Sequence, residues 1–206
     1  MIRAAFLDRD GVINRKAGEG EYVTRWEEMH ILPGVPEAIA SLNQAGFRVV
    51  VVSNQRCVAK GLITTLELEA LHRQICTALA EGGARIDAIY YCPHEAHPPC
   101  RCRKPRAGML FDAAKDHDID LAASWMIGDS DADVKAGQNA GCKTARLLED
   151  YQSTSGVDLV ASSLLEAVQQ ILRQEQLTDQ SCRGRDQARS HEKRTTNLRL
   201  RSSLQA

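Results

Sequence analysis

Short apolar runs alternate with longer amphipathic ones along the chain. The runs at 4–7 and 47–52 are rich in apolar side chains, which is typical of strands that are buried on both faces of a sheet. Between them, residues 33–45 carry apolar side chains at a helical spacing, and Gly46 follows as a stop signal. This alternation of strand-like and helix-like segments continues to about residue 173.

The remaining elements follow the same pattern. Residues 64–80 predict a long helix, with Thr64 as its N-cap and Glu67 three residues on, which together form a capping box. Further strands are predicted at 86–92, 125–127, 144–148 and 157–161, and further helices at 108–116, 132–140 and 163–173. Strands that alternate with helices predict an α/β fold, a Rossmann-like doubly wound parallel sheet without a large cap domain.

The composition changes near residue 174. Apolar periodicity fades there, Gln, Ser, Arg and Thr dominate, and basic residues outnumber acidic ones. We therefore predict one catalytic domain over residues 1–173 and a disordered basic tail over residues 174–206. A docking arm for an acidic partner is the alternative interpretation of this tail.

The overall charge balance argues against two classes of partner. The 206 residues include 26 Lys and Arg and 27 Asp and Glu, so there is no bulk reason to expect nucleic-acid or membrane binding. No apolar run is long enough to span a bilayer, and the N-terminus lacks the features of a signal peptide. We expect a cytoplasmic protein, and its seven cysteines cannot all pair internally.

Polar residues follow four of the predicted strands. In an open α/β sheet, the functional site lies beyond the carboxyl ends of the strands. The segments that reach this edge are Asp8-Arg9-Asp10-Gly11, Ser53-Asn54-Gln55, Arg103-Lys104 and Gly128-Asp129-Ser130-Asp131-Ala132-Asp133. We therefore expect carboxylates, a hydroxyl and cations to meet at one site.

This inventory suits phosphoryl transfer from a monoester. Asp8 can act as the nucleophile, which splits hydrolysis into two steps. Asp10 can give a proton to the leaving oxygen and later take one from water. Ser53 and Lys104 can hold the phosphoryl oxygens. A Mg²⁺ ion between Asp8 and Asp129 would reduce the repulsion between the carboxylate and the phosphate.

A second cluster indicates a structural metal. In extended backbone, residues i and i+2 point the same way, so each of two short motifs can present two ligands to one ion. Three sulfurs and one imidazole form the closed tetrahedral shell that structural Zn²⁺ prefers, and His97 is a rival for the imidazole position. The predicted ligands in this loop, residues 92–102, are Cys92, His94, Cys100 and Cys102.

The segment from Phe6 to Asn14 resembles the first motif of haloacid-dehalogenase (HAD) superfamily phosphatases. Ser53, Lys104 and Gly128-Asp129 stand where the second, third and fourth motifs of that superfamily belong. The resemblance implies a HAD-like fold, Mg²⁺, Asp8 as the nucleophile and Asp10 as the general acid and base. It also implies that Asp10 binds the metal through its backbone carbonyl, that Asp129 binds it directly, and that Asp133 supports the metal site.

Three other stretches narrow the resemblance. Tyr90–His94, Cys102–Pro105 and Gly108–Leu110 resemble the D-glycero-D-manno-heptose 1,7-bisphosphate 7-phosphatases, and the similarity covers about 2–172. This family implies a phosphosugar substrate from lipopolysaccharide precursor synthesis. Histidinol-phosphate phosphatases, which share these motifs, are the alternative family. The substrate contacts that the resemblance implies are Gly20, Glu21, Tyr22, Asn54, Gln55, Arg103 and Ser130.

One departure from the family pattern leaves the substrate open. Arg56-Cys57 replaces a Ser-Gly pair after the second strand. Arg56 could clash with the sugar or bind its distal phosphate, and Cys57 would be strained if this position requires a positive φ. An inactive phosphosugar-binding protein is therefore a further alternative, although binding alone would not need both Asp8 and Asp10. We expect a monomer.

Overall fold

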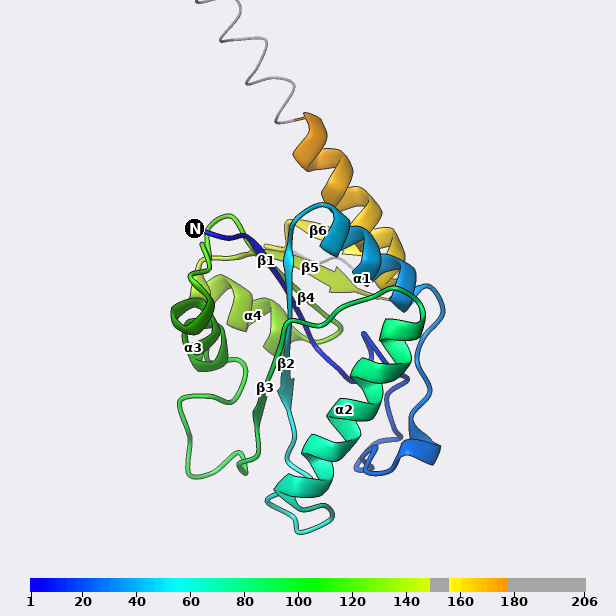
Figure 1. Ribbon diagram of the computed structural model, residues 1–206. Helices are drawn as coiled ribbons and strands as arrows, with labels where there is room; N and C mark the ends of the chain where they lie inside the picture. The colour runs from blue at the N-terminus through cyan, green and yellow to red at the C-terminus, as the bar shows by residue number, and fades with distance from the viewer. Residues whose placement is uncertain (149–155, 178–206) are drawn as a thin grey trace, which may run out of the picture. The chain divides into compact units, whose positions relative to one another are not determined.

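The computed structural model describes residues 1–148 and 156–177 (Figure 1). The chain divides into a unit of Met1–Gln169 and a second unit that begins at Gln170. In the second unit, the described residues 170–177 are helical. Most of the predicted basic tail, residues 178–206, lies outside the described residues. The domain boundary at residue 173 therefore stays a prediction.

The first unit is built on a six-stranded parallel sheet in the order β3-β2-β1-β4-β5-β6, and every neighbouring pair of strands is parallel. This arrangement confirms the predicted doubly wound sheet. Its strands are β1 Ala4–Leu7, β2 Arg48–Asn54, β3 Ala88–Cys92, β4 Trp125–Gly128, β5 Lys143–Leu147 and β6 Leu159–Ala161.

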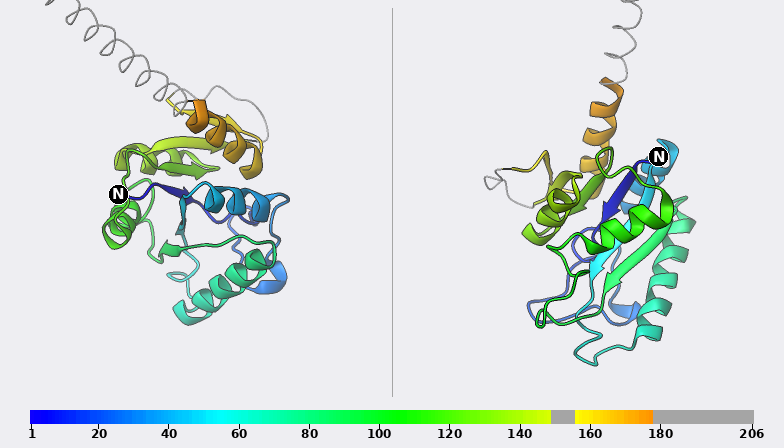
Figure 2. Two further views of the ribbon diagram at one scale, coloured as in Figure 1. Left: turned by 45° about the horizontal axis from the view of Figure 1, so that its top comes forward. Right: turned by 90° about the vertical axis from the view of Figure 1, so that its left-hand side faces the viewer.

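Helices cover both faces of the sheet. α1 packs beside α2 on one face, and α3 packs beside α4 on the other (Figure 2). Their bounds are α1 Val35–Gln44, α2 Thr65–Glu81, α3 Gly108–His117 and α4 Asp131–Ala140, with a short 3-10 helix η1 at Trp26–Glu28. The connections between strands contain no inserted domain in the described part of the chain.

The register of the central strands explains where the site forms. Leu7, the last residue of β1, lies opposite Val51 of β2 and Ile127 of β4. The Asp8 N–H then donates to the Ile127 carbonyl at 3.0 Å, so the pairing continues one residue beyond the strand. β1 and β4 are the neighbours at which the strand order changes direction, which is the switch point where such folds bind ligands.

Most predicted elements are observed with small shifts at their ends. β2 continues to Asn54, so Ser53 and Asn54 belong to the strand, whereas the sequence predicted its end at residue 52. α1 begins at Val35, after Gly34 has taken a left-handed conformation with φ of 76°. The capping box of α2 is confirmed, because Thr64 Oγ1 accepts from the Glu67 N–H at 3.2 Å and Glu67 Oε2 accepts from the Thr64 N–H at 2.8 Å.

α2 contains a buried histidine, His72. Its ring meets the Tyr91 ring edge-on, with 5.5 Å between the ring centroids. Burial lowers the pKa of His72 to about 4, so the ring is neutral at pH 7. The sequence does contain a signal for this burial, because Leu68, Ile75 and Leu79 lie at helical spacing on the same face of α2 as His72.

No helix in the described part of the chain is long and apolar enough to cross a bilayer.

α4 approaches the sheet closely at Gly137. A Cβ atom at this position would lie 2.6 Å from Met126 Cβ and 2.8 Å from Thr144 Cγ2, which are impossible contacts. Because α4 begins at the site, a shift of this helix would also move Asp133.

We predict that Gly137→Ala destabilises the protein by about 1–3 kcal/mol, because the overpacking outweighs the better helix propensity of alanine. Urea denaturation measures this free energy of unfolding. Lys135→Ala, at an exposed position of the same helix, is the control and should change stability by less than about 0.5 kcal/mol. Equal effects of the two substitutions would contradict the close approach.

Candidate active site and cysteine loop

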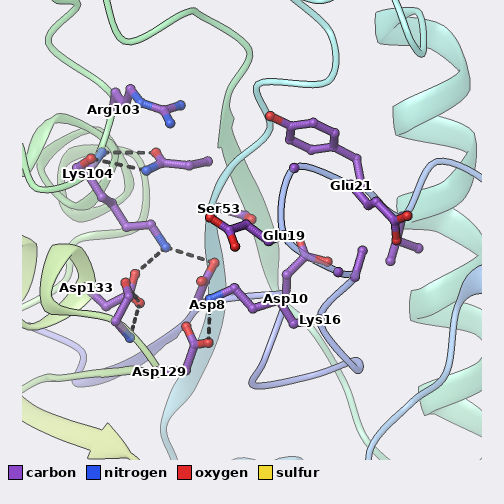
Figure 3. Close-up of a pocket in the computed structure, with 17 residues that line it drawn as sticks. Asp8, Asp10, Lys16, Glu19, Glu21, Ser53, Arg103, Lys104, Asp129 and Asp133 are labelled. Atoms are coloured by element: carbon purple, nitrogen blue, oxygen red, sulfur yellow. Dashed lines mark hydrogen bonds and ion pairs between the residues drawn. The ribbon is translucent and has the colours of Figure 1, made fainter.

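A cavity of about 620 Å³ lies at the carboxyl edge of β1, β2 and β4 (Figure 3). Its wall also includes the loop after β1, from Lys16 to Val23, and the Arg103-Lys104 segment. Most of the predicted site residues line this cavity: Asp8, Asp10, Gly20, Glu21, Tyr22, Ser53, Asn54, Arg103, Lys104, Asp129 and Ser130. Gln55 is the exception among the predicted substrate contacts, because it does not form part of the wall.

Lys104 holds two carboxylates together at the base of the cavity. Its Nζ lies 2.8 Å from Asp8 Oδ1 and 2.5 Å from Asp133 Oδ1, and it donates to the Val52 carbonyl at 2.7 Å. Burial by itself would lower the pKa of Lys104, but the charges of Asp8 and Asp133 outweigh it and raise the pKa above its usual value. The lysine is therefore a permanent cation at this position.

Asp8 sits where the sequence predicts a nucleophile. Burial raises the pKa of Asp8 to about 6, although the neighbouring Lys104 charge opposes the shift. Its Oδ1 also accepts from the Arg9 N–H at 2.7 Å, which fixes the carboxylate at the start of the loop. Near neutral pH the group is mainly ionised, which the predicted role as a nucleophile requires.

Three carboxylates form a candidate metal site. Asp8, Asp129 and Asp133 each offer one oxygen, and these oxygens lie within 4.8 Å of one another. Asp129 Oδ1 is buried and has no hydrogen-bond partner, while Asp129 Oδ2 accepts from Lys16 Nζ at 2.8 Å. A buried oxygen without a partner is costly unless a cation binds it. The donor set therefore fits a hard divalent cation such as Mg²⁺.

The Asp10 carboxylate is turned towards other partners. Both of its oxygens accept from Arg9 Nη2 at 2.9 Å, Oδ1 accepts from Asn14 Nδ2 at 2.9 Å, and Oδ2 accepts from Gln55 Nε2 at 3.0 Å. Burial would raise the pKa of Asp10, but the charge and hydrogen bonds of Arg9 outweigh it, so the pKa lies below its usual value. The side chain of Asp10 is therefore not a member of the carboxylate cluster, and only its backbone carbonyl remains available for the predicted metal contact.

Two basic residues near the site were missed by the sequence analysis. Arg9 is 1% exposed and forms a buried ion pair with Asp10, although arginine usually lies at the surface. Lys16 lies in the loop after β1 and pairs with Asp129, and this hydrogen bond raises the pKa of Lys16. Their only sequence signal was their place within and just after the first motif.

Asp133 and Ser130 both lie at the start of α4. Asp133 Oδ2 accepts from the Ser130 N–H at 3.1 Å and from the Ser130 hydroxyl at 2.5 Å. Gly128 lies directly against this pair, because a Cβ there would be 2.1 Å from Asp133 Cβ. Glycine at this position therefore allows Asp133 to reach under the site.

The unusual Arg56-Cys57 pair does not disturb the cavity. Arg56 forms an ion pair with Glu95 of the cysteine loop and is not part of the cavity wall, so its position supports neither of the two roles considered for it. Cys57 is fully buried. Asp118 is the one residue other than glycine with a positive φ in the described ranges, so the strain considered for Cys57 is absent.

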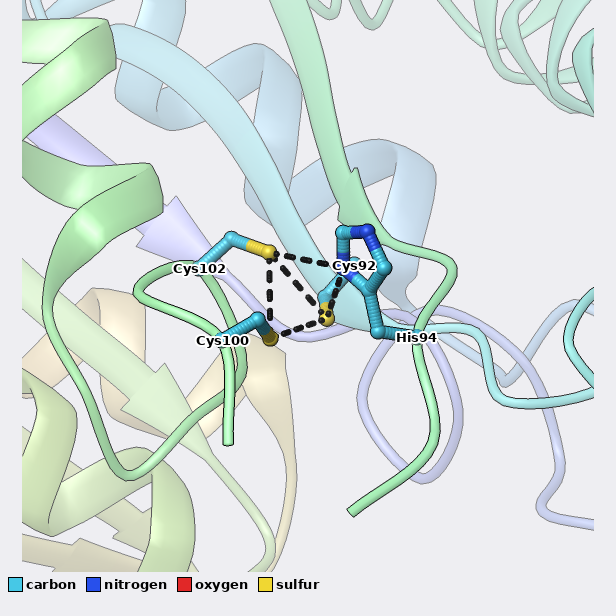
Figure 4. A group of neighbouring side chains, drawn as sticks. All are labelled: Cys92, His94, Cys100 and Cys102. Atoms are coloured by element: carbon cyan, nitrogen blue, oxygen red, sulfur yellow. Dashed lines mark hydrogen bonds between the residues drawn. The ribbon is translucent and has the colours of Figure 1, made fainter. Parts of the chain in front are cut away.

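The cysteine loop brings four ligand atoms together (Figure 4). The three sulfurs are 3.3–3.5 Å apart, and His94 Nδ1 lies 3.3 Å from Cys102 Sγ and 3.6 Å from Cys92 Sγ. A tetrahedron with sulfurs at 2.3 Å from zinc has edges of about 3.8 Å, close to this arrangement. The four residues therefore fit a structural Zn²⁺ ion, with His94 as the imidazole.

The thiols in this loop have strongly divergent pKa values. Burial opposes ionisation, but hydrogen bonds from the Arg103 backbone and the neighbouring thiols lower the pKa of Cys100 to about 6. Burial and the neighbouring sulfurs raise the pKa of Cys102 to about 12. Without a cation the protein alone does not stabilise three thiolates, whereas a divalent metal would.

Comparisons with known proteins give several relatives of this chain. A family model described as HAD-hydrolase-like matches residues 101–167. The D-glycero-D-manno-heptose-1,7-bisphosphate 7-phosphatase of Thermosynechococcus vestitus is 39% identical, and the match covers 82% of this chain and 94% of that protein. The corresponding β-heptose enzyme of Bordetella bronchiseptica is 43% identical over 68% of this chain and 78% of its own.

Solved structures give the same result. The crystal structure of D,D-heptose 1,7-bisphosphate phosphatase from B. bronchiseptica, complexed with magnesium and phosphate, is similar with a TM-score of 0.76 and 36% identity. This match covers 84% of the present chain and 99% of that one. A HAD-like phosphatase from Mesorhizobium loti, described as putative, has a TM-score of 0.72 and 31% identity over 81% and 86% of the two chains. The chain thus belongs to the D-glycero-D-manno-heptose-1,7-bisphosphate 7-phosphatase family of HAD-like phosphatases, which are phosphoric monoester hydrolases.

Proposed function

We propose that this protein hydrolyses the 7-phosphate of D-glycero-D-manno-heptose 1,7-bisphosphate through a phosphorylated Asp8. The observation that carries the proposal is the Asp8 carboxylate at the base of a cavity, beside Lys104 and the buried free oxygen of Asp129. The names of the relatives supply the substrate, and the magnesium and phosphate in the B. bronchiseptica crystal structure support the cofactor and the reaction class.

The reaction has two steps that share one acid-base group. In the first step an Asp8 oxygen bonds to phosphorus, the bond between phosphorus and the sugar oxygen breaks, and Asp10 gives its proton to that oxygen. In the second step Asp10 takes a proton from water, and the resulting hydroxide attacks phosphorus and releases Asp8 and inorganic phosphate. Because the charge of the incoming phosphate opposes the influence of Arg9, substrate binding favours the protonated form of Asp10.

Mg²⁺ would be held by Asp8, Asp129 and the backbone carbonyl of Asp10, with Asp133 as support. When bound, the ion neutralises the negative charge that the phosphoryl group and the carboxylates bring together. Asp129 Oδ1 is already buried beside this position without a partner, which supports the assignment.

Ser53 and Lys104 hold the oxygens of the transferring group. Asn54 orients Lys104: its side-chain oxygen accepts from the Lys104 N–H at 3.0 Å, and its nitrogen donates to the Lys104 carbonyl at 3.1 Å. Arg103 lines the same cavity, and its planar guanidinium suits the second phosphate of a bisphosphate. Gly20, Glu21, Tyr22 and Ser130 complete the proposed substrate contacts.

The proposed Zn²⁺ has a structural role. It would close the loop 92–102 through four protein ligands, which leaves no position for a reacting water. Because Arg103 and Lys104 directly follow Cys102, an ordered loop fixes both cations at the cavity. The cytoplasmic location and the monomeric state stay predictions.

We predict that Asp8→Asn lowers phosphate release from the heptose bisphosphate by at least about 1,000-fold, because the amide cannot attack phosphorus. The assay uses purified protein with Mg²⁺ and offers histidinol phosphate in parallel. Glu37→Gln, on the exposed surface of α1, is the control. Turnover of histidinol phosphate alone would overturn the assignment of the heptose bisphosphate as the substrate. Binding of the heptose bisphosphate without turnover by the unmodified protein would favour an inactive phosphosugar-binding protein.

We predict that Asp129→Asn weakens Mg²⁺ binding by about 10-fold or more, because one carboxylate charge and its free oxygen are lost. Isothermal titration with Mg²⁺ alone, after dialysis that leaves zinc in place, measures this affinity without substrate. Asp131→Asn, at an exposed neighbouring position, should bind Mg²⁺ as the unmodified protein does. The same affinity in Asp129→Asn would place the metal elsewhere.

We predict one zinc per chain by elemental analysis and its loss in Cys102→Ser. The melting temperature should fall by several degrees, because the metal contributes its binding energy to folding. Cys76→Ser, in α2 and outside the cluster, should keep its zinc. Absence of zinc from the purified protein, or its retention by Cys102→Ser, would contradict the ligand set.

A further inference from the structure

Gln55 lies beneath the cavity rather than on its wall. Gln55 is 1% exposed and does not line the cavity, although the family resemblance implied that it contacts the substrate. Its side-chain Nε2 donates to Asp10 Oδ2 at 3.0 Å and to Ser53 Oγ at 2.8 Å. One amide nitrogen therefore uses its two hydrogens to join the carboxylate of Asp10 to the hydroxyl of Ser53, the two groups proposed to act on the phosphoryl group.

The other end of the Gln55 amide is also held. Cys57 Sγ donates to Gln55 Oε1 at 3.5 Å, within the longer range of sulfur hydrogen bonds. Cys57 is fully buried in a small apolar cluster with Ile63 and Leu68, so the thiol cannot turn to water. An oxygen that accepts at one end and a nitrogen that donates at the other give the amide a single favourable orientation.

The backbone of Gln55 is anchored as well. Its N–H donates to the Cys92 carbonyl at 2.8 Å, and Cys92 is a member of the cysteine loop. Gln55 is thus fixed at its backbone and at both ends of its side chain. A residue that is held in this way can keep the groups that it contacts in fixed positions.

We propose that Gln55 is a positioning residue for the proton transfer by Asp10, and that the Cys57 thiol sets the direction of the Gln55 amide. This inference rests on the proposed phosphatase function. Arg9 and Asn14 also hold Asp10, but Gln55 is the residue whose side chain contacts both Asp10 and Ser53 among the hydrogen bonds of the described chain.

The link matters because the two partners act on the same phosphoryl group. Since Gln55 donates to Ser53 Oγ, the hydrogen of that hydroxyl is left to donate to a phosphoryl oxygen. Asp10 must meet the sugar oxygen on the same phosphorus, and proton transfer requires a heavy-atom distance of about 2.6–3.2 Å. A link between Ser53 and Asp10 therefore fixes the position of the Asp10 carboxyl group relative to the bound phosphate.

The test compares two leaving groups. An alkoxide needs a proton as it departs, whereas p-nitrophenolate leaves without one. We expect Gln55→Met, which keeps the volume but removes the amide, to lower kcat/KM for the heptose bisphosphate by about 30-fold. For p-nitrophenyl phosphate the same variant should lose less than about 3-fold. The ratio kcat/KM is used because it reports the steps up to departure of the leaving group.

Four further variants serve as comparisons. Asp10→Asn should show the same selective loss as Gln55→Met but larger. Cys57→Ala should lose about 3-fold on the phosphosugar alone, and Cys57→Ser, which restores a donor, should recover the unmodified rate. Gln44→Met, the same substitution at an exposed position of α1, should leave kcat/KM unchanged for both substrates.

The outcomes separate the inference from the proposed function. Equal losses of Gln55→Met on both substrates would indicate a general structural role and would overturn the inference. No loss on the phosphosugar would overturn it too. No activity of the unmodified protein on either substrate would overturn the proposed function, and then the inference falls with it. Mg²⁺ titration of Gln55→Met should match the unmodified protein, and a weakened affinity would count against positioning of Asp10.

Discussion

The buried ammonium of Lys104 is the interaction on which the site depends. Three carboxylates whose oxygens lie within 4.8 Å of one another repel strongly where water is scarce. Lys104 reduces this repulsion through contacts to Asp8 and Asp133, and it is itself held by the Val52 carbonyl of β2. Removing such a cation would leave uncompensated buried charges, which is far more costly than loss of a surface ion pair.

The position of Lys104 depends on contacts between β2 and the segment that follows the cysteine loop. The lysine comes two residues after Cys102, at the end of a loop that has no regular secondary structure between β3 and α3. Asn54, the last residue of β2, and the two residues after it contact this segment or the end of β3. Asn54 bonds the Lys104 backbone, Gln55 donates to the carbonyl of Cys92 in β3, and Arg56 pairs with Glu95. The unusual Arg56 thus belongs to the framework that supports the cavity.

The sequence predicted the parts of the molecule that local patterns determine. The strands, the capping box of α2 and the carboxylates at the strand ends follow from periodicity, cap chemistry and topology, and these need only neighbouring residues. The buried Arg9–Asp10 pair and the Lys16–Asp129 pair could not be predicted, because they depend on how a loop without periodicity folds back over the sheet edge. Gln55 shows the same limit: its type suits a substrate contact, and its burial depends on Cys57 and Asp10 packing around it.

The residues proposed for the reaction and those proposed for substrate specificity lie in different parts of the fold. Asp8 and Asp129 directly follow the paired strands β1 and β4, so the register of the sheet brings these two positions together. The residues that would distinguish one phosphosugar from another lie on the loop from Lys16 to Val23 and on Arg103, which no strand pairing holds. A fold of this kind can keep its phosphoryl-transfer chemistry while these segments change. Cys57 falls between the two classes, since it leaves the carboxylates in place and contacts Gln55, which holds Asp10.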